Sequence, residues 1–262
     1  MLRYLHLFWI QLRASLLQVM QYRADFVLDA ALSLLGPITA LVPLYVVFDN
    51  ADSLAGWSLH ETLLVVGWFM LLEGVLEGAI NPSLNTVVDH IRKGTLDFVL
   101  LKPADAQFLV STARFVPSRG VNVLAAIALF VWAFGQMGKA PDPEGMVQAL
   151  VLLATSSVLL YSLWILTVSL AFYVVKVDNL TYLFTSIFDA ARWPSTVFRG
   201  FWSVLFTFVI PLALMTTWPA QALLGNLSWG TLAGALIFCA AFAAMSRSIW
   251  MLSLRRYTSA SS

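Results

Sequence analysis

The stretch DHIRKGTLDFVLLKP, residues 89–103, is a polar and basic island inside an otherwise apolar sequence. It lies within a longer segment, residues 81–119, that separates two hydrophobic runs. Of the 262 residues, 60% are hydrophobic and 11% are charged, and the mean hydropathy is +0.83. Soluble domains carry roughly 25% charged residues. The composition therefore predicts an all-α membrane protein, with residues 81–119 as a loop outside the bilayer.

Six apolar segments have lengths near the roughly 20 residues that a hydrocarbon core requires. We expect transmembrane helices over about residues 26–48, 61–80, 121–137, 147–175, 201–217 and 229–252. Lys and Arg gather before the first span, between spans two and three, between spans four and five, and after span six, whereas the other loops are acidic, mixed or uncharged. The positive-inside rule therefore predicts an even number of spans and two cytoplasmic termini.

Residues 179–200 are harder to interpret, because helically spaced apolar residues alternate with charges. The charged residues are Asp189, Arg192 and Arg199. We expect an amphipathic cytoplasmic lead-in that Pro194 ends, since proline removes a backbone donor. The alternative, that this segment is part of span five, stays open. Pro211 and Pro219 should bend or end span five, leaving residues 217–227 as a short outer element.

Residues 1–25 are expected to form an amphipathic helix that lies in the membrane interface, followed by one six-helix domain over residues 26–262. At 100° per residue, two sectors separate. One holds Leu5, Phe8, Trp9, Leu12, Leu16 and Val19, and the other holds Arg3, His6, Arg13, Gln21 and Arg23. The basic sector would meet anionic headgroups while the aromatic residues enter the acyl boundary. The alternative is that this helix packs against other helices of the protein.

The loop over residues 81–119 carries the signals of a helix that docks on another protein. Asn81-Pro82-Ser83 resembles a helix start, and Gly94 suits the left-handed residue that ends a helix. An apolar ridge then follows between charges, formed by Leu96, Phe98, Val99, Leu100 and Leu101 and ended by Pro103. Such a ridge fits a groove on a partner. The alternative is a solvated loop whose charges only fix the topology.

The string IRKGTLDFVLLKP, residues 91–103, resembles the I-R-x-G-x-L-D-x-x-L-x-x-P signature after the second span of ABC-2 type permeases. Phe108 and Arg114 follow in the same order. The resemblance covers the whole chain and is greatest to the six-span bacterial subfamily. It includes the amphipathic start, Arg-Trp-Pro at 192–194, Ile-Pro at 210–211 and Trp-Pro-Ala at 218–220.

The resemblance implies the permease subunit of an ATP-driven exporter in a bacterial inner membrane, with a cytoplasmic coupling helix in a cleft of a separate ATPase subunit. The residues implied in coupling are Asp89, Ile91, Arg92, Lys93, Gly94, Thr95, Leu96, Asp97, Leu100, Leu101 and Lys102. The chain has no GxxxxGK[ST] phosphate loop, so ATP and Mg²⁺ are expected on an ATPase dimer. A second copy or a similar permease would complete the path for an amphiphilic or small-molecule cargo, whose identity the sequence does not indicate.

Four residues are candidates for a substrate path. Asp29, Glu73 and Glu77 lie in predicted spans, and an ionisable group in hydrocarbon must face protein or water. Glu73 and Glu77 are four residues apart and share a helix face, so they could attract a cationic amphiphile. The alternative is a structural role, in which Glu73 bonds a neighbouring helix and Asp29 pairs with Arg23 or Arg114. Trp218 could line an exit or anchor the interface.

Other classes of function find less support. The net charge of +1 and the lack of a basic tail argue against nucleic-acid binding. The single cysteine, Cys239, lies in an apolar run and is expected to pack, and His6, His60 and His90 have no metal-site spacing. No nucleophile and base, or metal cluster, points to an intramembrane enzyme. An ion-coupled carrier using Glu73 and Glu77 as a relay is the main rival, although no inverted repeat is visible.

Overall fold

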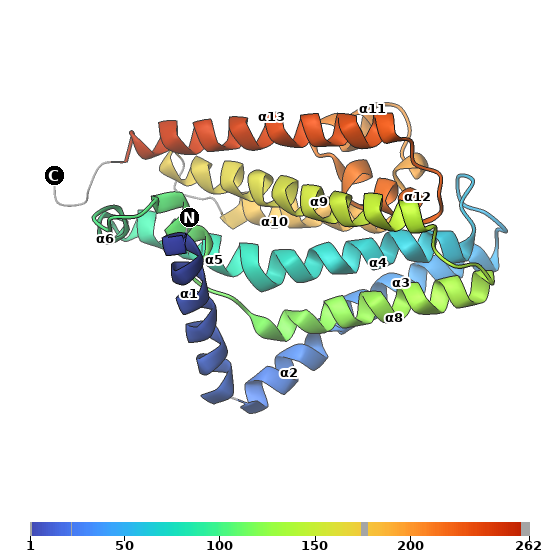
Figure 1. Cartoon of the computed structure of the whole chain (residues 1–262), viewed down its shortest axis with the longest axis horizontal. Helices are drawn as coiled ribbons and strands as arrows, with labels where there is room; N and C mark the ends of the chain where they lie inside the picture. The colour runs from blue at the N-terminus through green and yellow to red at the C-terminus, as the bar shows by residue number, and fades with distance from the viewer. Residues whose placement is uncertain (1, 22, 174–177, 258–262) are drawn as a thin grey trace.

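The computed structural model describes residues 2–21, 23–173 and 178–257, a bundle of long helices without a β-strand among those residues. The prediction of an all-α membrane protein is confirmed. Figure 1 shows α4, α8, α9 and α13 running side by side. Within these described ranges, five helices are long and apolar enough to cross a membrane, at Arg23–Asp49, Leu59–Arg92, Pro117–Met137, Pro143–Phe172 and Trp229–Leu254. The predicted boundaries at residues 1, 175 and 262 lie outside the described residues.

The two ends of the bundle are named here by the loops they carry. The inner end carries α1 and residues 93–105, and the outer end carries the loops 50–58 and 138–142. Helix α1 (Leu2–Gln21) lies across the inner end, at a steep angle to the long helices (Figure 1). The predicted N-terminal helix is thus confirmed as a helix. Its apolar Leu5 and Trp9 are exposed, so its place in the membrane interface stays a prediction.

Span one consists of α2 (Arg23–Ser33) and α3 (Leu35–Asp49). Span two is one continuous helix made of α4 (Leu59–Val75), a π turn (Leu76–Ile80) and α5 (Asn81–Arg92). The predicted new helix start at Asn81 is therefore wrong. Pro82 is accommodated because the π turn precedes it and because the carbonyl of Gly78, which a proline cannot bond, accepts the Val116 N–H at 2.8 Å instead.

Spans three and four match their predictions within the described residues. They are α8 (Gly120–Met137), after a 3₁₀ turn (Pro117–Arg119), and α9 (Pro143–Ser169), which continues as a 3₁₀ turn (Leu170–Phe172). Helix α4 is the most buried and packs against α8. Gly67 permits this approach, because a Cβ there would lie 2.4 Å from the Phe130 ring.

The predicted fifth span at 201–217 is wrong, since the backbone there is broken. It consists of α11 (Phe201–Val204), two π turns (Leu205–Val209 and Ala213–Thr217) and α12 (Trp218–Leu223). The break falls at Pro211, as proline chemistry requires. Ser156 Oγ donates to the Leu214 carbonyl at 3.3 Å in the middle of α9, while α12 ends beside Asp142 at the outer end. The segment is a hairpin that reaches into the bundle from the outer end. Its second limb, residues 210–223, is largely buried, whereas the first limb has exposed side chains at Phe201, Trp202, Val204 and Val209.

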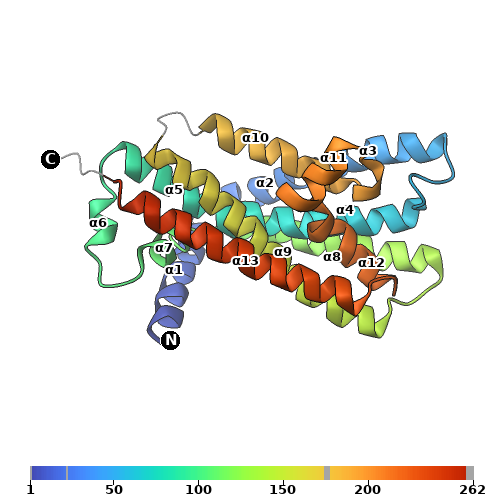
Figure 2. The same cartoon turned by 90° about the horizontal axis from the view of Figure 1, so that it is seen from above.

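The predicted cytoplasmic lead-in at 179–200 is also wrong, because this segment runs from one end of the bundle to the other. It contains α10 (Asp178–Phe188) and two 3₁₀ turns (Asp189–Arg192 and Ser195–Val197). Helix α10 begins at the inner end beside the end of α9 (Figure 2). Thr196 Oγ1 accepts a hydrogen bond from Trp57 Nε1 at 3.1 Å, and Trp57 is in an outer loop. The sequence did not predict this passage, because α10 has only 11 residues, fewer than the roughly 20 that a helix needs to cross a bilayer.

The chain closes with α13 (Trp229–Leu254), which matches the predicted sixth span and packs along α9. Ser228 caps its first turn by accepting the Thr231 N–H at 3.1 Å. Ser246 Oγ donates to the Ser162 carbonyl of α9 at 3.0 Å. Cys239 is buried between the same helices, in agreement with its expected packing role.

Candidate functional site

The turn after α5 has the geometry that its sequence predicts. Helix α5 ends at Arg92, and Gly94 adopts a φ of +64°, the left-handed region that glycine enters without strain. The Thr95 N–H donates to the His90 carbonyl at 2.9 Å, which closes the C-terminal capping motif. The predicted end of the helix is confirmed, and this cap turns the chain sharply into the next segment.

The apolar ridge after this turn divides between the core and the surface. Helix α6 (Asp97–Leu100) is a single turn. Leu96 is fully buried and anchors it, whereas Phe98 is 70% and Leu101 81% exposed. Leu100 is also exposed, so these three side chains form an apolar patch at the inner end. The prediction of one continuous ridge is wrong for Leu96, which is buried, and for Val99, which is half-buried, because these two side chains pack on the core and hold the turn against the bundle.

Exposed charged side chains flank this patch in the sequence. Asp89, Arg92, Lys93 and Lys102 are exposed, Ile91, Gly94, Thr95 and Asp97 are half-buried, and Leu96 is buried. The predicted coupling residues therefore separate into an outer set and a set that shapes the turn. We call Phe98, Leu100, Leu101 and the four exposed charged residues the loop surface.

Hydrogen bonds tie the segment that follows the loop surface to α9 and α13. Asp105, the cap of α7 (Ala106–Ser111), receives Arg247 Nη2 of α13 at 2.5 Å. Gln107 Oε1 accepts Arg247 Nη1 at 2.6 Å, and Gln107 Nε2 donates to the Tyr161 hydroxyl of α9 at 2.9 Å. Burial opposes ionisation of Asp105, but the hydrogen bonds from Arg247 and from the Phe108 N–H outweigh it and lower its pKa.

Helix α1 contacts the same loop along its length. The Asp105 N–H donates to the Tyr4 hydroxyl at 3.2 Å, and the Tyr4 and Phe108 rings meet edge to face at 4.9 Å. Arg3 donates to the Pro103 carbonyl. The segment around Pro103 to Gln107 is therefore bonded to α1, α9 and α13.

A second group of charges lies in the middle of the bundle. Arg192 Nη2 pairs with Asp189 Oδ1 at 2.9 Å, and its guanidinium lies 5.2 Å from the centroid of the Phe69 ring. Phe69 is ten residues from the start of α4, a rise of roughly 15 Å, or half of a ~30 Å hydrocarbon core. Within the described residues, the buried Glu73 Oε2 has no hydrogen-bond partner. We call Glu73, Asp189 and Arg192 the mid-bundle charge cluster.

This cluster is open on one side, since the Asp189 side chain is 50% exposed. Helix α3 passes close by, because a Cβ on Gly36 would lie 3.6 Å from Glu73 Oε1. A carboxylate exposed at mid-depth cannot be left facing lipid tails without a large free-energy cost. The face that carries Asp189 therefore needs protein or water against it.

A family comparison agrees with this architecture. The model of the ABC-2 family transporter proteins matches residues 34–261. The chain belongs to the ABC-2 transporter family. No curated protein and no solved structure matches it. As an ABC-2 protein, the chain is a multi-pass membrane component of transport rather than a catalytic subunit, and the family implies an ABC ATPase as its partner.

In this ABC-2 protein the other predicted path residues have local partners. Glu77 Oε1 accepts Asn81 Nδ2 at 2.7 Å, so it is bonded within its own helix. Asp29 accepts from Ser118 and pairs with Arg119 at 3.2 Å, which corrects the expected pairing with Arg23 or Arg114.

Trp218, at the start of α12, is half-buried against the core. Of the four predicted path residues, the structure brings Glu73 alone into the mid-bundle charge cluster.

The remaining members of the cluster, Asp189 and Arg192, were not predicted as site residues. Their signal is an i, i+3 pair of opposite charges inside an apolar segment long enough to cross a bilayer. The positive-inside rule places an arginine near a span end in the cytoplasm. The rule therefore misplaced Arg192, together with Asp189 in the same predicted segment. Phe98, the most exposed side chain of α6, was assigned to the ridge but not to the coupling residues.

Proposed function

We propose that this chain is the permease subunit of an ATP-driven exporter whose loop surface docks in a cleft of a separate ATPase. The observation that carries the proposal is the exposed pair Phe98 and Leu101 at the inner end of span two. Large apolar side chains ringed by charge are typical of protein interfaces. The family match supports an ATPase as the occupant.

Transmission of motion follows from the contacts of the loop. The segment that leads from α7 to α8 is bonded to span two, since Ser83 Oγ donates to the Arg114 carbonyl at 2.6 Å and the Gly78 carbonyl accepts the Val116 N–H. The hydrogen-bonded cluster of Asp105, Gln107 and Arg247, which we call the hub, connects the loop to α9 and α13. Closure of an ATPase dimer would therefore shift several spans as one unit.

The proposed placement puts the inner end in the cytoplasm of a bacterial cell, with both termini on that side. Residues 178–197 would be the fifth of six membrane passages, and residues 201–223 a re-entrant hairpin. The even passage number agrees with the basic residues around α1, the loop surface and the chain end. Arg199, near the outer end, is an exception to the charge rule.

The substrate path would run along the mid-bundle charge cluster, between this chain and a second copy or a similar permease. The half-exposed Asp189 supports this, because a partner subunit or water would supply the environment that lipid tails cannot. Cargo with an apolar body and a polar or cationic group fits such a face. An ion relay through Glu73 and Glu77 finds less support, since Glu77 is bonded to Asn81.

Co-purification tests this function. The wild-type chain from its native host should recover an ATPase with a GxxxxGK[ST] motif, and Phe98→Asp/Leu101→Asp should lose it. Asn85→Asp, at an exposed position of α5, is the matched control and should retain the ATPase. Recovery of no such ATPase by the wild-type chain, or equal recovery by the double variant, would refute the proposal.

A further inference from the structure

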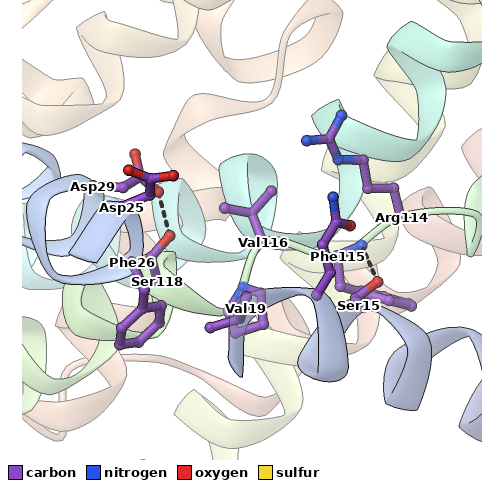
Figure 3. A pocket seen from close by; sticks show the side chains of 11 residues that line it. Ser15, Val19, Asp25, Phe26, Asp29, Arg114, Phe115, Val116 and Ser118 are labelled. Carbon is purple, nitrogen blue, oxygen red and sulfur yellow. Dashed lines mark hydrogen bonds between the residues drawn. The ribbon is translucent and has the colours of Figure 1, made fainter. Parts of the chain in front are cut away.

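A pocket lies at the inner end of the bundle between α1, α2 and the segment that returns to α8. Its volume is about 280 Å³, close to the lower end of small-molecule sites, roughly 300–1,000 Å³. Figure 3 shows Asp25 and Asp29 on one side and Arg114 on the other, with Val19 and Val116 between them. The pocket therefore presents both signs of charge on partly apolar walls.

Two of these charges are available to a ligand. The side chains of Asp25 and Arg114 are exposed, and within the described residues neither forms a hydrogen bond or an ion pair. The backbone of Arg114 is nevertheless fixed, because its N–H donates to Ser83 Oγ at 3.1 Å. Asp29 is partly engaged by Ser118 and Arg119. Arg114 thus lines the pocket from a segment whose backbone is hydrogen-bonded to span two.

The position of the pocket indicates the kind of ligand. It adjoins α1, whose neighbouring Leu16 and Met20 are 41% and 62% exposed. The predicted interfacial position of α1 would place this helix, and the pocket beside it, at the depth of lipid headgroups. Phe26, at the start of span one, also lines the pocket and is half-buried. A polar group bound here would therefore continue into acyl chains beside α2.

We propose that this pocket binds the headgroup of phosphatidylethanolamine from the inner leaflet. The phosphate would accept two hydrogen bonds from the Arg114 guanidinium, whose planar fork matches phosphate oxygens. The ammonium has three N–H donors and would lie between the carboxylates of Asp25 and Asp29. Phosphatidylglycerol has no cation for this pair, and the quaternary ammonium of phosphatidylcholine has no N–H to donate. The site does not depend on an ATPase partner.

Native mass spectrometry of the purified full chain with defined lipids tests the proposal. The protein is mixed with equal amounts of phosphatidylethanolamine, phosphatidylcholine and phosphatidylglycerol, and the retained lipids are counted. The wild-type chain should retain phosphatidylethanolamine about tenfold over either competitor, as expected for one charge-assisted contact. Equal retention of the three lipids would overturn the proposal.

Charge variants assign the binding to the pocket. Asp25→Asn should abolish the preference for phosphatidylethanolamine, and Arg114→Gln should lower the retention of all three lipids, because each carries the phosphate that Arg114 binds. Arg13→Gln on α1 and Asp52→Asn in an outer loop should keep both the preference and the retention of the wild type. Asp25→Arg should reverse the preference toward phosphatidylglycerol, a gain that misfolded protein would not show. A wild-type preference in Asp25→Arg or in Asp25→Asn, or wild-type lipid retention in Arg114→Gln, would contradict the assignment.

Discussion

Truncation of the exposed pair on α6 should weaken ATPase binding without unfolding the permease. Phe98 and Leu101 are 70% and 81% exposed. If burial of a whole side chain is worth roughly 2 kcal/mol, covering these fractions contributes about 1.4 and 1.6 kcal/mol. Each 1.4 kcal/mol is a tenfold change in Kd. Phe98→Ala and Leu101→Ala should each raise Kd about tenfold, and the double variant roughly a hundredfold.

The assay is the Kd between the detergent-solubilised permease and its purified ATPase, with the melting temperature of each variant measured alongside. The double variant should keep the wild-type melting temperature. Leu96→Ala provides the contrast, because Leu96 is fully buried and its truncation should cost about 2–5 kcal/mol of folding stability. A change in Kd of less than about threefold in the double variant, with Asn85→Ala as control, would refute the reasoning.

Three further predictions concern the hub, the packing of α9 and the charge cluster. Asp105→Asn should lower stability by at most about 1 kcal/mol at pH 7, because Asp105 and Arg247 are 36% and 42% exposed. The folded state lowers the pKa of Asp105, so the stability that its carboxylate contributes is fully present above the ordinary pKa of aspartate and is lost as the pH falls through the lowered pKa of the folded protein. At a pH below both pKa values, Asp105→Asn and the wild-type protein should have the same melting temperature. Gly145→Ala should cost about 1–3 kcal/mol, since its Cβ would lie 1.8 Å from an α12 carbonyl oxygen, whereas Gly135→Ala has open space and should not destabilise. Glu73→Gln should reduce transport of cationic cargo in vesicles and spare neutral cargo; an equal effect on both would exclude a charge-selective role.

Much of the fold could be predicted because its signals are local. Gly94 ends α5 through a left-handed conformation that its sequence position suggests. The spans α8, α9 and α13 are long apolar runs with polar boundaries, so hydropathy and length suffice to find them. The string around residues 91–103 was enough to suggest the family, which the match over residues 34–261 confirms.

The errors arose where tertiary contacts override a local rule. Arg192 was placed outside the membrane by its charge, yet Asp189 and the Phe69 ring provide partners for it inside the bundle. Pro82 was taken to start a helix, but a π turn and the Val116 N–H let the helix continue through it. These partners come from distant segments, which no local pattern of charge or proline reveals.

The central claim, that the loop surface receives a separate ATPase, is tested most directly by photo-crosslinking in intact cells. A photoreactive phenylalanine analogue in place of Phe98 should form a covalent adduct with a GxxxxGK[ST] protein on irradiation. The same analogue in place of Asp52, in an outer loop, should form none. Absence of an ATPase adduct from position 98, or an equal yield from position 52, would contradict the account.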